Sequence, residues 1–89
     1  MRSYTATETF WKSFYALSAE QKESSRAAWE IFKVDPFDPR LRSHKIQALS
    51  GRAGRTVYSC VIEADLRVLF CLEGSTVITM DIGTHDVYR

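Results

Sequence analysis

The chain has 89 residues, enough for one domain with a single modest core, and 45% of them are hydrophobic. This composition excludes intrinsic disorder, and no apolar run approaches the roughly 18 residues of a membrane-spanning helix. The N-terminus, Met1-Arg2-Ser3-Tyr4-Thr5, lacks the apolar core of a signal peptide, so we expect a cytoplasmic protein without a membrane partner.

The net charge of +1 conceals an uneven distribution along the chain. Residues 1–38 carry five basic and six acidic side chains, whereas residues 39–89 carry seven basic and five acidic ones. A basic segment without any intervening acid lies within residues 39–89: Arg40, Arg42, Lys45, Arg52 and Arg55, with His44 among them. Such a segment suits a polyanion such as RNA, although exposed loops are often basic without any function.

Two capping motifs predict two consecutive helices. Thr5-Ala-Thr-Glu8 has the form of a capping box, in which the threonine oxygen accepts an amide and the glutamate reaches back. The apolar side chains that follow have the spacing of one helical stripe: Phe10, Phe14 and Leu17, widened by Trp11 and Tyr15. Ser18-Ala-Glu-Gln21 is a second capping box, so the first helix should end near Leu17 and the second should begin at once.

The second helix is predicted to bury a face made of Ala27, Ala28, Ile31 and Phe32, and Trp29 lies off that face. Core packing is the ordinary role of these aromatic residues. An exposed Trp11 or Trp29 would instead indicate a surface for a partner. Pro36 ends the helix because a proline disfavours helical dihedral angles in the residue before it.

The second half of the chain predicts three antiparallel strands, separated by the hairpin turns Ala64-Asp65 and Gly74-Ser75. Leu66, Val68 and Phe70 alternate with Arg67, which therefore belongs to the opposite face of the sheet. Residues 3–5 are a further, short edge strand. The two helices should cover one face of this sheet and leave the other open as a shallow cleft beside the basic segment.

The two cysteines are predicted to be reduced and buried. In the expected register Cys60 pairs near Val68 or Leu69 and Cys71 near Tyr58 or Val57, a diagonal offset of about 7–10 Å. The Cα atoms of a disulfide lie within about 7 Å of each other. We expect no metal site, because two histidines and two scattered cysteines lack ligand spacing.

Four short motifs, in this order and spacing, resemble the RelE/ParE toxin superfamily of bacterial toxin–antitoxin modules. They are Asp38-Pro-Arg-Leu41, His44-Lys45 followed by Leu49-Ser-Gly51, Asp65-Leu-Arg67-Val-Leu-Phe70, and Ile82-Gly-Thr-His85-Asp-Val-Tyr88. The resemblance covers nearly the whole chain. It implies an α+β fold, with residues 1–89 forming one domain: a short N-terminal strand, then a two-helix hairpin packed on a three- to four-stranded antiparallel sheet.

Two activities occur on that fold, so the fold does not decide between them. RelE-like members cleave mRNA, usually on the ribosome, and ParE-like members inhibit DNA gyrase. In the nuclease branch the resemblance assigns catalytic roles to Arg67, His85 and Tyr88, and the Gly-Thr-His sequence is most similar to the YafQ type, which adds Asp65. The RNA-binding residues would be those of the basic segment: Arg40, Arg42, His44, Lys45, Arg52 and Arg55.

The chemistry of these residues suits RNA cleavage without a metal or cofactor. An arginine offers a planar donor fork to a phosphate, and a histidine can give or take a proton near neutral pH. Tyr88 could stack on a base. Structural roles are the alternative: Arg67 could pair with Asp81 or Glu63, Asp65 could be only a turn residue, and Tyr88 could only hold the C-terminus.

The sequence also departs from the YafQ-type pattern. A second histidine is missing near Cys60 and Val61, Leu66 replaces a tryptophan, and Asp81 occupies an often basic position. The leading hypothesis is an mRNA endoribonuclease toxin, acting on the ribosome and held inactive by a cognate antitoxin. The alternatives are a gyrase inhibitor without nuclease activity and an inactive member that only binds antitoxin. A dimer or a toxin–antitoxin hetero-oligomer is compatible with each.

Overall fold

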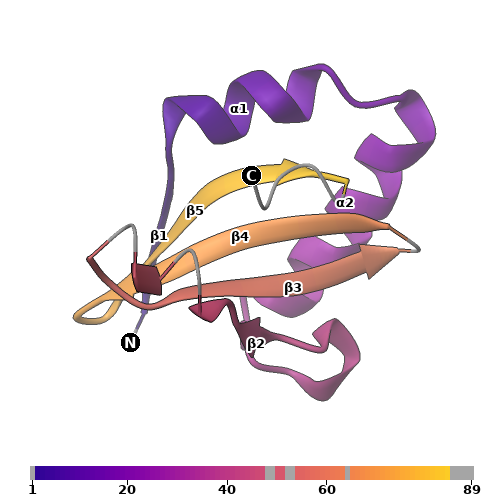
Figure 1. Cartoon of the computed structure of the whole chain (residues 1–89). Helices are drawn as coiled ribbons and strands as arrows, with labels where there is room; N and C mark the ends of the chain where they lie inside the picture. The colour runs from indigo at the N-terminus through magenta and orange to yellow at the C-terminus, as the bar shows by residue number, and fades with distance from the viewer. Residues whose placement is uncertain (1, 48–49, 52–53, 64, 85–89) are drawn as a thin grey trace.

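The computed structural model of the chain describes residues 2–47, 50–51, 54–63 and 65–84. Five strands form one sheet in the order β1-β5-β4-β3-β2, and two α-helices pack on it, as the predicted α+β class requires (Figure 1). The elements are β1 (Ser3–Ala6), α1 (Glu8–Tyr15), α2 (Ala19–Phe32), the 3₁₀ helix η1 (Pro39–Leu41), β2 (His44–Lys45), β3 (Val57–Glu63), β4 (Leu66–Glu73) and β5 (Thr76–Gly83).

The predicted antiparallel strands form the centre of the sheet. Strand β4 lies between β3 and β5, and each connection spans two residues, at positions 64–65 and at Gly74-Ser75. Gly74 has a φ of +61°, in the left-handed region that a residue with a Cβ rarely adopts. Both hairpins predicted from the turn residues are therefore confirmed.

The edges of the sheet differ from the expectation of three or four antiparallel strands. Strand β1 is the predicted N-terminal edge strand, and it pairs with β5 in parallel, with Ser3 opposite Thr76. The two residues of β2 add a fifth strand, antiparallel to β3. The sequence did not predict β2, because two polar residues show no alternation to recognise.

A β-bulge at Met80 sets the orientation of the end of β5. Leu69 pairs with Asp81 and Phe70 pairs with Thr79, so Met80 is an extra residue in β5. Beyond the bulge, Ile82 turns into the core, where it is 3% exposed, and Gly83 turns to the opposite face. The Thr7 hydroxyl donates a hydrogen bond of 2.8 Å to the Met80 carbonyl oxygen and so satisfies the bulged backbone.

One cap of the two helices was predicted correctly. Ser18 and Gln21 form the expected capping box of α2, with backbone-to-side-chain distances of 3.0 and 3.1 Å. The prediction for α1 was wrong by two residues: Thr5 lies in β1, and Thr7 accepts the Phe10 amide at 3.1 Å. Glu8 is therefore in the first turn of α1.

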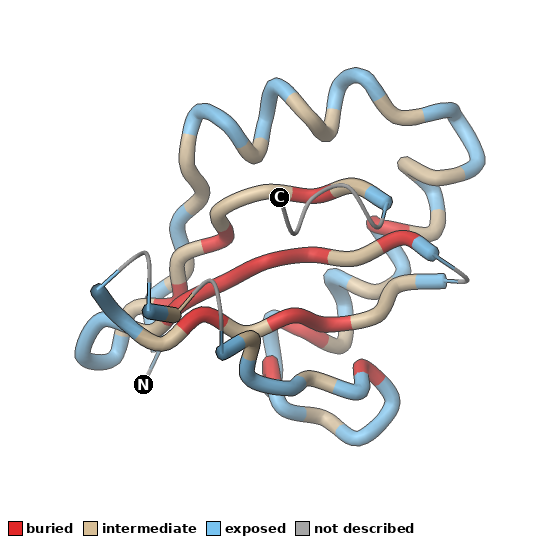
Figure 2. The backbone as a smooth tube through the Cα atoms, viewed as in Figure 1, coloured by how far each residue is buried: buried red, intermediate tan, exposed pale blue. Residues whose placement is uncertain are grey.

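The core lies between α2 and the sheet. Phe70 of β4 is completely buried. Its ring meets Phe32 edge to face, with centroids 5.1 Å apart, and stacks on Tyr58, with centroids 5.4 Å apart. Figure 2 shows the buried residues concentrated in the central strands. On α2 the prediction was wrong for Ala27, which is exposed, whereas Ser25 is buried and donates to the Gln21 carbonyl oxygen.

Both cysteines are free and buried, as predicted. Cys60 pairs with Val68 and Cys71 with Val57, so their side chains project from opposite faces of the sheet. Burial raises the pKa of the Cys60 thiol to about 12. Within the part of the chain that the structure describes, no helix is long and apolar enough to cross a bilayer.

Replacing Thr7 with valine should lower the free energy of unfolding by about 1–2 kcal/mol, because the helix cap and the bond to the bulge are lost together. The matched change Thr5→Val affects an exposed strand residue and should change stability by less than about 0.5 kcal/mol. Urea unfolding followed by circular dichroism measures both. Equal losses for the two variants would contradict the assigned cap.

Candidate functional site

The sheet face opposite the helices carries Arg67, and we call it the Arg67 face. Its side chains follow from the strand register: residues directly opposite each other in neighbouring strands share a face. The residues of the Arg67 face used below are His44, Val57, Ser59, Val61, Arg67, Leu69, Cys71, Asp81 and Gly83.

Arg67 lies near the start of β4, between Val61 of β3 and Gly83 of β5. Its side chain is partly buried, and Nη1 donates a hydrogen bond of 3.4 Å to the carbonyl oxygen of Leu66. Gly83 has no side chain, so β5 places none directly opposite Arg67. The predicted catalytic residues His85 and Tyr88 follow Gly83 in the sequence but lie outside the described residues.

His44 belongs to the same face, although the sequence placed it only in a basic loop. It pairs with Ser59, which pairs in turn with Leu69, two residues beyond Arg67 on β4. At ordinary strand spacing, the Cα atoms of His44 and Arg67 are therefore about 12 Å apart, with Ser59 and Leu69 between them on this face. The sequence could not predict that His44 lies on this face, because β2 is only two residues long.

The backbone at Arg42 orients the His44 ring. Arg42 has a φ of +51°, an uncommon conformation for a residue with a side chain, and it ends η1. Its carbonyl oxygen lies 3.1 Å from Nδ1 of His44. In the tautomer in which Nδ1 donates to this carbonyl, Nε2 is the acceptor that remains for a substrate. His44 is exposed, so a substrate can reach that nitrogen.

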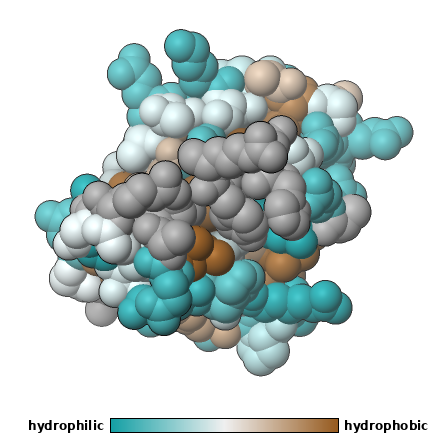
Figure 3. Space-filling view, in the orientation of Figure 1, coloured by the Kyte–Doolittle hydropathy of each residue, from teal (hydrophilic) through white to brown (hydrophobic). Residues whose placement is uncertain are grey.

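The Arg67 face is not open along its whole length, which differs from the open cleft expected from the sequence. Ser59 and Cys71 are completely buried, and Leu69 is 6% exposed. At the end of this face near Val57, Ser50 Oγ accepts the Val57 amide at 2.8 Å. Figure 3 views the molecule from the direction of Figure 1, and hydrophilic residues gather along the lower part of the surface it shows.

Asp81 does not lie directly opposite Arg67. The bulge at Met80 places it opposite Leu69, and its Oδ1 accepts the backbone amide of Ile82 at 2.8 Å. Asp65, the other candidate acid, is exposed in the turn that leads into β4. The sequence left open a direct cross-strand pair between Arg67 and Asp81. In the structure the two residues are not opposite each other, and the Asp81 carboxylate contacts the backbone.

The basic segment is not one continuous surface. Arg40 forms two hydrogen bonds of 3.0 Å with Asp38, and Arg55 lies 3.2 Å from Glu73 and 3.5 Å from the Cys71 sulfur. Lys45 pairs with Tyr58 and so projects from the side of the sheet opposite His44. Arg42 is exposed, and Arg52 lies outside the described residues.

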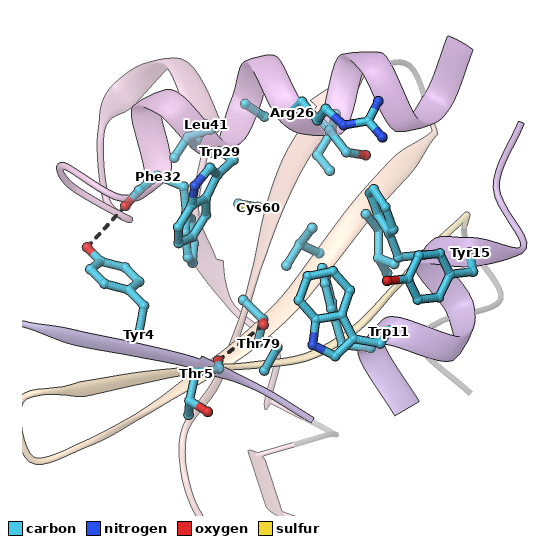
Figure 4. Close-up of a pocket in the computed structure, with 18 residues that line it drawn as sticks. Tyr4, Thr5, Trp11, Tyr15, Arg26, Trp29, Phe32, Leu41, Cys60 and Thr79 are labelled. Carbon is cyan, nitrogen blue, oxygen red and sulfur yellow. Dashed lines mark hydrogen bonds between the residues drawn. The ribbon is translucent and has the colours of Figure 1, made fainter. Parts of the chain in front are cut away.

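The aromatic residues of the helices were expected in the core, and the structure places several of them around a groove. We call this the helix groove; it has a volume of about 570 Å³ and lies between α1, α2 and the sheet (Figure 4). Trp11, Tyr15 and Trp29 line it and are 46%, 67% and 41% exposed. Exposure of Trp11 or Trp29 is the feature that indicates a surface for a partner.

Among the residues that the structure describes, no group of three or more histidine, cysteine, aspartate or glutamate side chains is arranged to hold a metal ion. The side chains that the structure describes on the Arg67 face include the guanidinium of Arg67, the imidazole of His44 and the carboxylate of Asp81. Such groups can bind a phosphate and transfer a proton.

No family model matches the chain, and no curated protein matches it in sequence. Solved structures match its fold. YafQ from E. coli BL21(DE3) has a TM-score of 0.74 at 13% identity, covering 99% of this chain and 98% of that one. The RelE–RelB complex from Pyrococcus horikoshii has a TM-score of 0.71 at 11% identity and 93% coverage of each chain.

A third match is the E. coli DinJ–YafQ toxin–antitoxin complex, with a TM-score of 0.69 at 14% identity, covering 97% of this chain and 94% of that one. The chain has the fold of the YafQ and RelE toxins. The order of strands and helices expected from the RelE/ParE resemblance is thereby confirmed. At these identities the likeness concerns the fold.

The pairing of Arg40 with Asp38 can be measured by titration. The hydrogen bond from Arg40 lowers the pKa of Asp38 from 3.8 to about 2, so the ionised carboxylate favours the folded state above pH 4 and loses that effect towards pH 2. Arg40→Gln should raise the pKa of Asp38 towards 3.8, so that on acidification the folded state loses this stabilisation at a higher pH. Arg42→Gln should change neither the pKa nor the acid stability. Carboxyl carbon NMR measures the pKa, and an unchanged value in Arg40→Gln would contradict the assigned pair.

Proposed function

We propose that this chain is the toxin of a type II toxin–antitoxin pair and that it cleaves mRNA without a metal ion. The observation that carries the proposal is that Arg67 and His44 share one face of the sheet, and that Arg67 lies opposite Gly83, after which the chain continues to His85. The fold of the YafQ and RelE toxins supports the toxin assignment.

The proposed reaction needs three operations: deprotonation of a ribose 2′-hydroxyl, stabilisation of the charged phosphorane, and protonation of the leaving 5′-oxygen. Arg67 supplies the permanent cation that binds the phosphate. His44 and His85 supply two imidazoles, one as base and the other as acid. His44 would take the role of the second histidine that the sequence lacks near Val61.

The proposed substrate is single-stranded mRNA, presented by the ribosome, and Tyr88 would stack on an unpaired base. The described members of the basic segment are all exposed: Arg40, Arg42, His44, Lys45 and Arg55. Arg40 and Arg55 already contact acids, and Lys45 projects from the other side of the sheet. We therefore assign few backbone contacts to this segment. The partner that inhibits the toxin would be an antitoxin, since the matched complexes pair RelE with RelB and YafQ with DinJ.

Expression of the chain alone should arrest growth, and Arg67→Gln or His85→Ala should relieve the arrest by lowering cleavage about 100-fold or more, because each removes charge stabilisation or proton transfer. Lys33→Gln, at the C-terminal cap of α2, is the matched loss of a cation and should stay toxic. Mapping of 5′ ends in cellular mRNA measures cleavage. Undiminished cleavage in both site variants would remove the catalytic assignment.

The same experiment separates the alternative functions. New 5′ ends in mRNA support the nuclease, whereas growth arrest with intact mRNA and DNA damage signalling supports a ParE-like gyrase inhibitor. Absence of arrest supports an inactive member that only binds antitoxin. Circular dichroism of each variant shows that the fold is retained.

His44→Ala should lower the rate constant for cleavage about 100-fold and change RNA affinity little, because the imidazole transfers a proton rather than binding the backbone. The comparison is Arg42→Ala, which removes an exposed cation next to it and should weaken binding more than chemistry. Single-turnover cleavage of a short RNA at several enzyme concentrations separates the two effects. An unchanged rate constant in His44→Ala would exclude it as acid or base.

A further inference from the structure

Thr7 connects the start of α1 to the last strand of the sheet through its side chain and its backbone. Its hydroxyl accepts the Phe10 amide at 3.1 Å as the cap of α1 and donates to the Met80 carbonyl oxygen at 2.8 Å. Its backbone amide donates to the Thr79 carbonyl oxygen at 2.9 Å. The Thr79 hydroxyl in turn donates to the Thr5 carbonyl oxygen at 3.3 Å (Figure 4). One short side chain thus holds a helix cap and a strand together.

The strand residue that Thr7 holds is the extra residue of the β-bulge. Met80 has no partner in the pairing of β4 with β5, because Leu69 pairs with Asp81 and Phe70 pairs with Thr79. A bulge bends its strand and increases the local twist, so the direction of the strand beyond it depends on the backbone there. The Thr7 hydroxyl therefore acts on β5 at the position where its pairing with β4 is irregular.

The bulge decides which residue of β5 faces Arg67. With the bulge, Gly83 lies opposite Arg67, whereas uninterrupted pairing would place Ile82 there. Ile82 is 3% exposed, and its burial keeps the bulge in the strand. Burial of an apolar side chain has no preferred direction, however, so it does not fix the angle at which the strand continues. The hydrogen bond at Met80 is directional, and the chain continues from Gly83 to His85.

We propose that Thr7 is a positioning residue for the reaction on the Arg67 face. It acts through the backbone of Met80, which sets how Gly83 and the chain after it lie beside Arg67. This role rests on the proposed function, because it serves the same site. A displacement of about 1 Å caused by a mutation far from the chemistry can cost about 100-fold in rate. Loss of this one hydrogen bond therefore lowers the rate constant for cleavage and leaves RNA affinity nearly unchanged.

Two substitutions at Thr7 separate its bond to Met80 from its role as a helix cap. Thr7→Val removes both, so a loss of activity in that variant could follow from lower stability alone. Aspartate and asparagine have the same shape, and both accept the Phe10 amide as helix caps of similar strength. Only asparagine can donate to the Met80 carbonyl oxygen, because an ionised carboxylate is an acceptor only. Thr7→Ser keeps the hydroxyl and with it both bonds.

Single-turnover cleavage of a short RNA at increasing protein concentration separates the rate constant at saturation from the concentration that gives half of it. Thr7→Asp should lower the rate constant about tenfold or more and change the half-saturating concentration by less than about twofold. Thr7→Asn and Thr7→Ser should retain the rate constant within about threefold. Urea unfolding of Thr7→Asp and Thr7→Asn should show similar midpoints, so that a difference in rate between them is not a difference in stability.

Amide chemical shifts of the same variants provide a readout that needs no RNA. The amides of Arg67 and Gly83 should shift in Thr7→Asp and stay near their wild-type positions in Thr7→Ser. An undiminished rate constant in Thr7→Asp, equal losses in Thr7→Asp and Thr7→Asn, or unchanged shifts at Gly83 would overturn the proposal. If the wild-type chain cleaves no RNA, the proposed function fails, and the shifts at Gly83 alone decide whether Thr7 sets the geometry of this face.

Discussion

The arrangement of the whole molecule depends on one extra residue, Met80, in the last strand. Without it, the two-residue period of a strand would turn Asp81 into the core and Ile82 out of it. With it, Ile82 packs in the core and Gly83 lies beside Arg67. The bond from Thr7 to the Met80 carbonyl oxygen holds this bulge to the start of α1, and so connects the helical side of the sheet to the Arg67 face.

The sheet separates two surfaces of different chemistry. One is the Arg67 face, where polar and cationic groups meet near the ends of β3, β4 and β5. The other is the helix groove, apolar and ringed by exposed aromatic residues. The two surfaces therefore suit different ligands, one polar and anionic and the other apolar.

Local sequence patterns predicted those parts of the fold that depend mainly on residues close together in the chain. The turn at Gly74-Ser75, the capping box at Ser18 and the core side of β4 are of this kind. The choice of Thr7 over Thr5 as a cap was missed, because the pairing of β1 with β5 takes Thr5 into the sheet. The sequence also could not predict that Trp11 and Trp29 are partly exposed, because an apolar helical stripe does not show whether another element covers it.

The candidate site was only partly predictable. Arg67 was assigned to the right face by alternation alone, but the place of His44 depends on a two-residue strand and on the positive φ of Arg42, neither of which has a sequence pattern. The most direct test of the account is an amide NMR titration with a single-stranded RNA carrying 2′-O-methylribose throughout, which lacks the attacking 2′-hydroxyl. Shifts at His44, Arg67 and Gly83, with little change in α1 and α2, are predicted; shifts confined to the two helices would contradict it.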